Sequence, residues 1–362
     1  DGGFGLAVTA SNVTFSGIVG GVTALGSFTA VGDTTTRLGG GKFETSGSQS
    51  FGGAVTLLDN ANLVGGSLAL ANGLAGGGND LTLEFTESMV IDGDSVFSGI
   101  GNLSVIGDVA LNATIMTTGF QNYSGSATLL GDTSLFTGAS GDVGFGSTVD
   151  GSHDLSIEAG VGRIDFFGAL GSTAPLQGLN LASASAVEAL DTLAIDGAGG
   201  SGPGLRFGPA VDNVNISQPG STITNAAQEG ILFAGGSANS TVGGFAITNS
   251  GASGVAALTG SYTGSIFSNS TVTGSANDGF AAFNADGLSV TDSEFSTNAG
   301  DGIHFDAVSN ATAQNNVIGN NDFYGVLVVS TDPLANTSNV SVTGNFIGTN
   351  VDEDDTANGR SG

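Results

Sequence analysis

Gly302-Ile303-His304-Phe305 is one of five short segments in which a glycine precedes an aliphatic or aromatic residue and opens an apolar run. The other four are Gly230-Ile231-Leu232-Phe233, Gly254-Val255-Ala256-Ala257, Gly279-Phe280-Ala281-Ala282 and Gly325-Val326-Leu327-Val328. Successive glycines of this set are 24, 25, 23 and 23 residues apart. A fixed period of this size is typical of a solenoid, in which each repeat packs only against its neighbours. The second half of the chain is therefore predicted to be a solenoid.

Each repeat contains two further stretches. A second strand-like segment follows the glycine run, as in Leu288-Ser289-Val290-Thr291, and a third segment ends in asparagine. These asparagines are Asn225, Asn249, Asn298, Asn320 and Asn350. Three short strands separated by corners make one coil of a parallel β-helix, in which each strand pairs with its equivalent one coil on, about 4.8 Å away. Asparagine tolerates the left-handed backbone of such corners, and its side chains can stack into a hydrogen-bonded ladder.

The first half of the chain repeats differently. Residues 45–51 (TSGSQSF) align with residues 117–123 (TTGFQNY), and the match continues from residues 54–58 to residues 126–130. The offset of 72 residues is compatible with about three to four coils. A glycine-rich segment, Gly197–Gly204, marks the join, and we interpret it as a loop where one solenoid changes its coil geometry.

These patterns resemble two known repeat families. The glycine-rich turns and the cadence of residues 117–133 are similar to the repeats of filamentous-haemagglutinin-type adhesins, and residues 205–350 resemble the right-handed parallel β-helix shared with pectate-lyase-like proteins. The resemblance implies an all-β, right-handed parallel β-helix (β-solenoid) of about 15–18 coils in one continuous rod. Residues 1–200 would carry the haemagglutinin-like repeats, and residues 201–362 the coils of 23–25 residues. Such families include adhesins, filament proteins and polysaccharide-cleaving enzymes, so fold alone does not decide the function.

Composition excludes several function classes. The formal net charge is −28 with only five lysines and arginines, so nucleic acid and anionic membranes would be repelled. The 64 glycines accompany 39% apolar residues, enough to form a core. The chain has no cysteine and no apolar run of about 18 residues, so we expect neither disulfides nor membrane insertion. We expect an extracellular or cell-surface protein that a bacterium secretes, and we interpret this chain as a piece of a longer protein.

Candidate catalytic residues are sparse. Lyases on this fold need a basic group, and hydrolases need clustered acids beside aromatic platforms. The chain has one lysine, four scattered arginines, no tryptophan and three tyrosines, so it is predicted not to be an enzyme. The most enzyme-like cluster is Asp301-Gly302-Ile303-His304-Phe305-Asp306, in which His304 and Asp306 share the outer face of a predicted strand. A surface pair without a role is the alternative. His153 is interpreted as a turn residue.

Two acidic segments are candidate calcium sites, because calcium prefers several oxygen ligands supplied by loops. One contains Asp92 and Asp94, with Asp80 and Asp108 expected in nearby coils. The other contains Asp352, Asp354 and Asp355. Solvated acidic turns are the alternative, and no other cofactor is predicted.

The outer face of the glycine-led strands is predicted to be apolar. If Ile231 and its equivalents point inward, the outward residues include Leu232, Ala256, Leu258, Ala281, Phe283, Leu327 and Val329. Soluble monomers rarely expose such a stripe, so we expect it to pack against another solenoid or a covering segment. Of these residues, Leu232, Leu258, Phe283, Leu327 and Val329 are the predicted interface. A change of strand register in some coils is the alternative.

The favoured function is structural. We expect a secreted protein that builds or decorates a fibre, sheath or matrix, or serves as an adhesin stalk, with lateral or end-to-end self-association and surface glycans as a possible ligand. The alternative is a carbohydrate-binding or polysaccharide-cleaving β-helix. An ice-binding face would require a regular Thr-x-Thr array, which residues 34–36 and isolated pairs do not supply.

Overall fold

The computed structural model describes residues 1–332, 337–348 and 358–359, except for the side chains of residues 93–95. Throughout these residues the regular elements are β-strands, and the strands pair in parallel with strands one coil away. No helix in the described ranges is long and apolar enough to cross a membrane. The chain divides into two compact units, Asp1–Ala169 and Leu170–Gly362, called unit 1 and unit 2. The prediction of an all-β parallel solenoid is confirmed, with about 14 turns in the described residues rather than 15–18.

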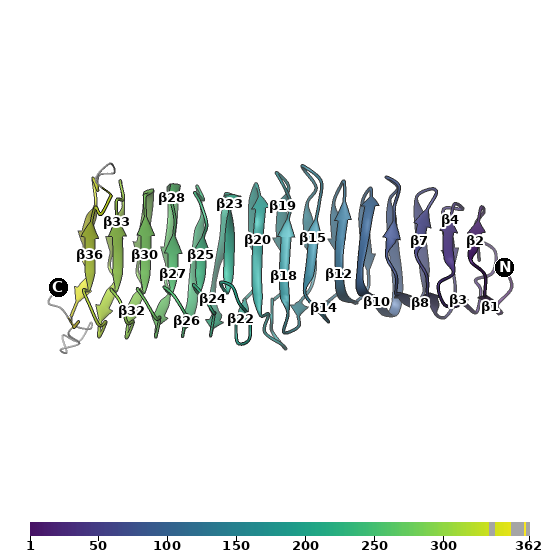
Figure 1. Cartoon of the computed structure of the whole chain (residues 1–362), viewed down its shortest axis with the longest axis horizontal. Coiled ribbons are helices and arrows are strands. Elements are labelled where there is room, and N and C mark those ends of the chain that lie inside the picture. The colour runs from purple at the N-terminus through teal and green to yellow at the C-terminus, as the bar shows by residue number, and fades with distance from the viewer. Residues whose placement is uncertain (333–336, 349–357, 360–362) are drawn as a thin grey trace. The chain divides into compact units, whose positions relative to one another are not determined.

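Most strands of unit 1 are short, and they stack in order of residue number (Figure 1). They are β1 (Gly5–Val8), β2 (Asn12–Phe15), β3 (Ser27–Ala30), β4 (Thr35–Leu38), β5 (Lys42–Glu44), β6 (Gln49–Phe51), β7 (Val55–Leu57), β8 (Ala61–Leu70), β9 (Leu74–Ala75), β10 (Leu81–Ile100), β11 (Leu103–Ile106), β12 (Val109–Thr117), β13 (Gln121–Tyr123), β14 (Ala127–Leu129), β15 (Thr133–Phe136), β16 (Val143–Phe145), β17 (Val149–Asp150), β18 (Asp154–Glu158) and β19 (Arg163–Phe166).

Unit 2 follows the same plan. Its strands are β20 (Gly178–Ala184), β21 (Ala186–Ala189), β22 (Ala194–Asp196), β23 (Leu205–Val211), β24 (Val214–Thr224), β25 (Ile231–Phe233), β26 (Thr241–Thr248), β27 (Val255–Ala257), β28 (Gly260–Ser268), β29 (Thr271–Thr273), β30 (Phe280–Phe283), β31 (Ala285–Thr291), β32 (Glu294–Ser296), β33 (Ile303–Asp306), β34 (Thr312–Gln314), β35 (Val317–Gly319), β36 (Val326–Val329), β37 (Ser341–Thr343) and β38 (Phe346–Ile347).

In the last coils of unit 2 each strand pairs with the third strand after it, so one coil contains three strands. β27 pairs with β30, β28 with β31 and β29 with β32, and the same step leads on to β33, β34 and β35. The register joins Ile231 to Val255, Val255 to Phe280 and Phe280 to Ile303, which reproduces the steps of the glycine pattern. All four of these side chains are fully buried. The glycine-led strand is therefore the same strand of successive coils.

The glycine of each repeat is required by the core beneath it. A Cβ on Gly230 would meet the Ile247 side chain, and would lie 2.6 Å from the Gly254 carbonyl oxygen. The equivalent Cβ on Gly302 would meet Ile318 and lie 2.6 Å from the Gly325 oxygen. Because a core side chain and the carbonyl oxygen of the next repeat glycine both lie against this position, only a residue without a Cβ fits.

Asparagine ladders form at the corners of unit 2. Asn225, Asn249 and Asn320 have left-handed backbone, with φ of 53°, 57° and 56°, as predicted. At the fourth repeat Thr297 takes this position instead, with φ of 57°, and Asn298 turns inward to 1% exposure. Asn350 lies outside the described residues. The left-handed corner therefore tolerates a residue other than asparagine when the asparagine beside it is used in the interior.

Inside the corner, Asn298 stacks on Asn321. The backbone N and Nδ2 of Asn298 donate to Oδ1 of Asn321, at 3.1 and 2.9 Å. Asn321 in turn donates both groups to Oδ1 of Asn358, and its Nδ2 also donates to the Phe295 carbonyl. Such buried amides are stable only when their hydrogen bonds are made, so the ladder fixes the register of adjacent coils.

The 72-residue repeat of unit 1 is also visible in its hydrogen bonds. Buried Gln121 donates through Nε2 to the Ile115 and Phe136 carbonyls, and buried Gln49 donates to the Phe43 and Val64 carbonyls. One difference separates the two copies. Tyr123 donates its hydroxyl to Gln121 Oε1 at 2.9 Å, whereas Phe51 stands at the equivalent position and Gln49 Oε1 is buried without a partner.

Candidate functional site: a histidine beside two carboxylates

The most concentrated group of ionisable side chains in the described residues lies on the outer face of β30 and β33. The glycines that open the repeats of unit 2 are called ladder glycines. Asp278 directly precedes the ladder glycine Gly279, and Asp301 directly precedes the ladder glycine Gly302 one coil later. His304 lies on β33 with its side chain outward, between the buried Ile303 and Phe305. The coil geometry therefore brings together residues that are 23 and 26 positions apart in the sequence.

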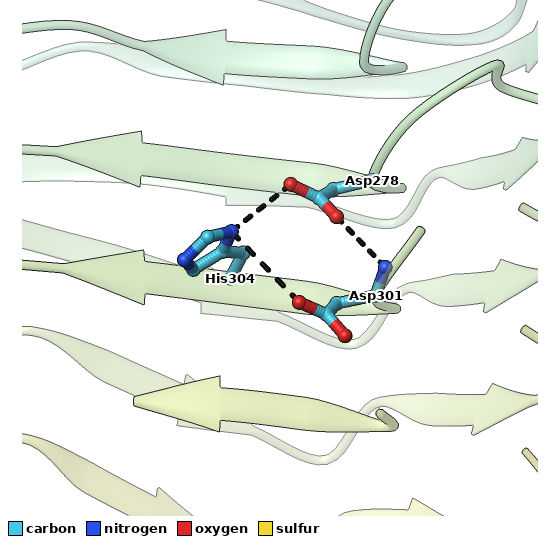
Figure 2. A group of neighbouring side chains, drawn as sticks. All are labelled: Asp278, Asp301 and His304. Atoms are coloured by element: carbon cyan, nitrogen blue, oxygen red, sulfur yellow. Dashed lines mark hydrogen bonds and ion pairs between the residues drawn. The ribbon is translucent and has the colours of Figure 1, made fainter. Parts of the chain in front are cut away.

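Both carboxylates face the same nitrogen of the imidazole (Figure 2). Nδ1 of His304 lies 3.1 Å from Oδ2 of Asp278 and 3.8 Å from Oδ2 of Asp301. Since ionised carboxylates only accept hydrogen bonds, Nδ1 carries a proton and donates a hydrogen bond to Asp278. The side chains of His304, Asp278 and Asp301 are 19%, 14% and 8% exposed, so water screens the cluster incompletely.

These contacts stabilise the charged histidine. The hydrogen bond to Asp278 raises the pKa of His304, burial of the ring opposes the rise, and the charges of the neighbouring aspartates reinforce it. Nε2 of the same ring is buried without a nitrogen or oxygen partner. The ring of Phe283 packs against the imidazole edge to face, with centroids 5.4 Å apart, so packing holds the ring orientation on this side.

The predicted pair of His304 and Asp306 does share one outer face, but other aspartates make the close contacts to the histidine. Asp306 accepts hydrogen bonds from the backbone N and the hydroxyl of Thr331. The strand pattern alone does not indicate Asp278, although its position before a ladder glycine, one repeat ahead of Asp301, is a usable signal. His153 lies in a turn before β18, as predicted, with Nδ1 3.8 Å from exposed Asp132.

The acidic segments proposed for calcium are described only in part. Oδ1 of Asp92 accepts a hydrogen bond from Asn112 Nδ2 at 2.8 Å, and Asp80 Oδ1 accepts from Asn102. Oδ1 of Asp108 accepts from the backbone N of Ser126. The Asp94 side chain and Asp352, Asp354 and Asp355 lie outside the described residues, so calcium binding at these two places stays a prediction.

The predicted apolar stripe is present but discontinuous. The register places Leu232, Ala256, Ala281, His304 and Leu327 in one outward row. Leu258 is 37% exposed, and the other predicted interface residues, Leu232, Phe283, Leu327 and Val329, are half-buried. Ala256 and Ala281 are 3% and 0% exposed, which corrects the expectation of a continuous open stripe: these methyl groups are too short to reach past their neighbours.

A family model described as the right-handed β-helix region matches residues 204–356. The match covers less than half of the chain, and it agrees with the parallel β-solenoid fold described above. No curated protein and no solved structure was found to match it. The β-helix is compatible with adhesins and with polysaccharide-acting proteins, and the resemblance of residues 1–200 to haemagglutinin-type repeats stays a prediction.

Proposed function

We propose that this β-helix is an extracellular structural protein of a bacterial surface, which builds or decorates a fibre, sheath or matrix, or forms the stalk of an adhesin. The observation that carries the proposal is the strand-for-strand pairing of successive coils, reinforced by hydrogen-bonded side chains such as Asn298 and Asn321. In such an array stability is approximately a sum over neighbouring coils, so added coils extend the protein without a new core. Length and surface are the products of this design.

One exposed recess of unit 2 lacks the groups that glycoside hydrolysis needs. A recess of about 400 Å³ beside β24 and β26 is lined by uncharged residues, with no carboxylate, histidine, lysine or arginine among them. Its lining residues are Ser217, Pro219, Gly220, Ser221, Thr222, Gly244, Phe245, Ala246, Asn269 and Thr271. A glycoside hydrolase needs paired carboxylates in its cleft, so this recess does not supply hydrolytic chemistry.

The proposal is tested by electron microscopy and analytical ultracentrifugation of the purified protein over a range of concentrations. Fibres, sheets or laterally paired particles support a structural role with self-association. Isolated particles that bind cells or glycans without assembling support the stalk. Isolated particles that do neither would contradict the proposal.

A carbohydrate-acting β-helix is the second candidate, because Asp278 and Asp301 place two carboxylates beside a histidine. The test is release of reducing ends, or of unsaturated products, from neutral and acidic polysaccharides. Activity that Asp301→Asn abolishes while the protein stays folded would replace the structural proposal with an enzymatic one.

A further inference from the structure

The geometry points to a site for one divalent transition-metal ion, for which Zn²⁺ is the probe, formed by Asp278, Asp301 and His304 on the outer face of unit 2. This inference does not depend on the structural role proposed above. The three side chains offer one imidazole nitrogen and two carboxylate oxygens, a donor set that zinc accepts. The ligand atoms all lie within 4.8 Å of one another.

The distances from the imidazole nitrogen to both carboxylate oxygens fit a shared ion. Bonds from zinc to nitrogen or carboxylate oxygen of about 2.0–2.2 Å place two ligands of a tetrahedral ion roughly 3.3–3.5 Å apart. Nδ1 of His304 lies 3.1 Å from the Asp278 oxygen and 3.8 Å from the Asp301 oxygen, which brackets that separation. Three protein ligands leave one position of a tetrahedral ion for water or another ligand.

The two carboxylates are held in place by the coil that follows each of them. Oδ1 of Asp278 accepts the backbone N of Asp301 at 2.7 Å, and Oδ1 of Asp301 accepts the backbone N of Tyr324 at 2.8 Å. The backbones at these positions are also paired, since Gly279 donates to the Asp301 carbonyl and Gly302 to the Tyr324 carbonyl. Each Oδ2 is thereby directed to the imidazole, and little side-chain ordering is left for the ion to impose.

A metal ion satisfies this geometry better than a proton does. A proton on Nδ1 makes a hydrogen bond with Asp278 at 3.1 Å, but the 3.8 Å separation from Asp301 is too long for a second one. A divalent ion coordinates all three atoms and balances the two carboxylate charges. Binding then displaces the Nδ1 proton to solvent. Calcium and magnesium are poor competitors, because both prefer oxygen ligands to imidazole.

The experiment uses the full chain, free of any polyhistidine tag and stripped of metal with a chelator. Zn²⁺ is titrated calorimetrically in physiological salt with excess Ca²⁺, which suppresses weak binding to the acidic surface. Because the chain contains only two histidines, proton NMR of their ring C–H groups reports which one binds. We expect one tight site per chain and a shift of the His304 resonances alone.

Matched variants make the assignment specific. His304→Gln and Asp278→Asn should each weaken Zn²⁺ binding by at least about 100-fold, whereas His153→Gln should leave it unchanged. Circular dichroism confirms that each variant is folded, and the near-isosteric Asp278→Asn keeps an acceptor for the Asp301 amide. The inference is overturned by the absence of saturable one-to-one binding, by full displacement of Zn²⁺ by Ca²⁺, by a response at His153 instead, or by unchanged affinity in folded His304→Gln.

Discussion

Replacing Gly230 by alanine tests why the repeat begins with glycine. The new methyl would meet the Ile247 side chain and lie 2.6 Å from the Gly254 carbonyl oxygen, where ordinary contacts are 3.4–4 Å. Ile247 can rotate only into a packed core, and the Gly254 carbonyl already accepts the backbone N of Ile231. Overpacking typically costs 1–3 kcal/mol, and because a backbone atom must also move we expect a loss of about 2–3 kcal/mol in the free energy of unfolding.

Gly202→Ala is the matched control within unit 2. Its Cβ would have no atom within 4 Å, and its φ lies outside the left-handed region, so alanine fits without strain. Restricting the unfolded chain should then stabilise the protein by about 0.4–1 kcal/mol. Both variants are compared with the parent by urea unfolding followed by far-ultraviolet circular dichroism, with the m-value checked for constancy. An unchanged midpoint for Gly230→Ala, or an equal loss for Gly202→Ala, would refute the steric argument.

Three further predictions use contrasts within the chain. Tyr123→Phe should lower the free energy of unfolding by about 1–3 kcal/mol, because Gln121 Oε1 loses its hydrogen-bond donor, and Phe51→Tyr should raise it by about 1 kcal/mol by giving Gln49 Oε1 a donor. Urea midpoints that move in the same direction for both variants would contradict the equivalence of the two positions. Asn321→Ala should lower the free energy of unfolding by about 2–4 kcal/mol, because the backbone and side-chain N–H groups of buried Asn298 lose their acceptor. Asn320→Gly should be nearly neutral in the same assay, because glycine adopts the left-handed φ of 56° found there. In protein stripped of metal, the raised pKa of His304 contributes stability that is fully present below the unfolded pKa of about 6.5 and is lost as pH rises through the folded pKa. Thermal unfolding measured over a series of pH values should show this loss, and His304→Gln should remove it. An identical pH profile for the variant would exclude the contribution.

The fold could be predicted from the sequence because parallel pairing requires nearly the same chain length in every coil. The spacing of the ladder glycines is therefore the register itself, as the pairs Ile231–Val255 and Phe280–Ile303 show. The inward side chains followed from strand alternation, since every second residue of such a strand faces the same side. Extra residues within a coil do not disturb this logic, because they leave the coil as loops.

The burial of the outer face could not be predicted in the same way. Alternation places Ala256 and Ala281 outward, yet both are buried, because exposure there depends on the size of the side chains in the coils above and below.

The position of the asparagines at the corners could not be predicted from residue type either, because asparagine is suited both to the left-handed corner and to the inner ladder. At Thr297 and Asn298 the buried hydrogen bonds to Asn321 are made by the asparagine, and the corner is left to threonine.

The ionisable cluster shows how a solenoid hides a site from a search over adjacent residues. His304 and Asp306 are two positions apart on one strand, which separates them by roughly 6.6 Å along the backbone. Asp278 is 26 positions away, yet it is the closer partner, because positions one coil apart are neighbours in space. Within the described residues of unit 2, the position before the ladder glycine is occupied in turn by Pro203, Glu229, Ser253, Asp278, Asp301 and Tyr324, so Asp278 and Asp301 are the adjacent acids of that column. The neighbouring outward column contains Arg206, Leu232, Ala256, Ala281, His304 and Leu327. The histidine of one column thus lies beside the paired acids of the other, and columns read at the coil period, rather than motifs read along the chain, are where function in such a protein should be sought.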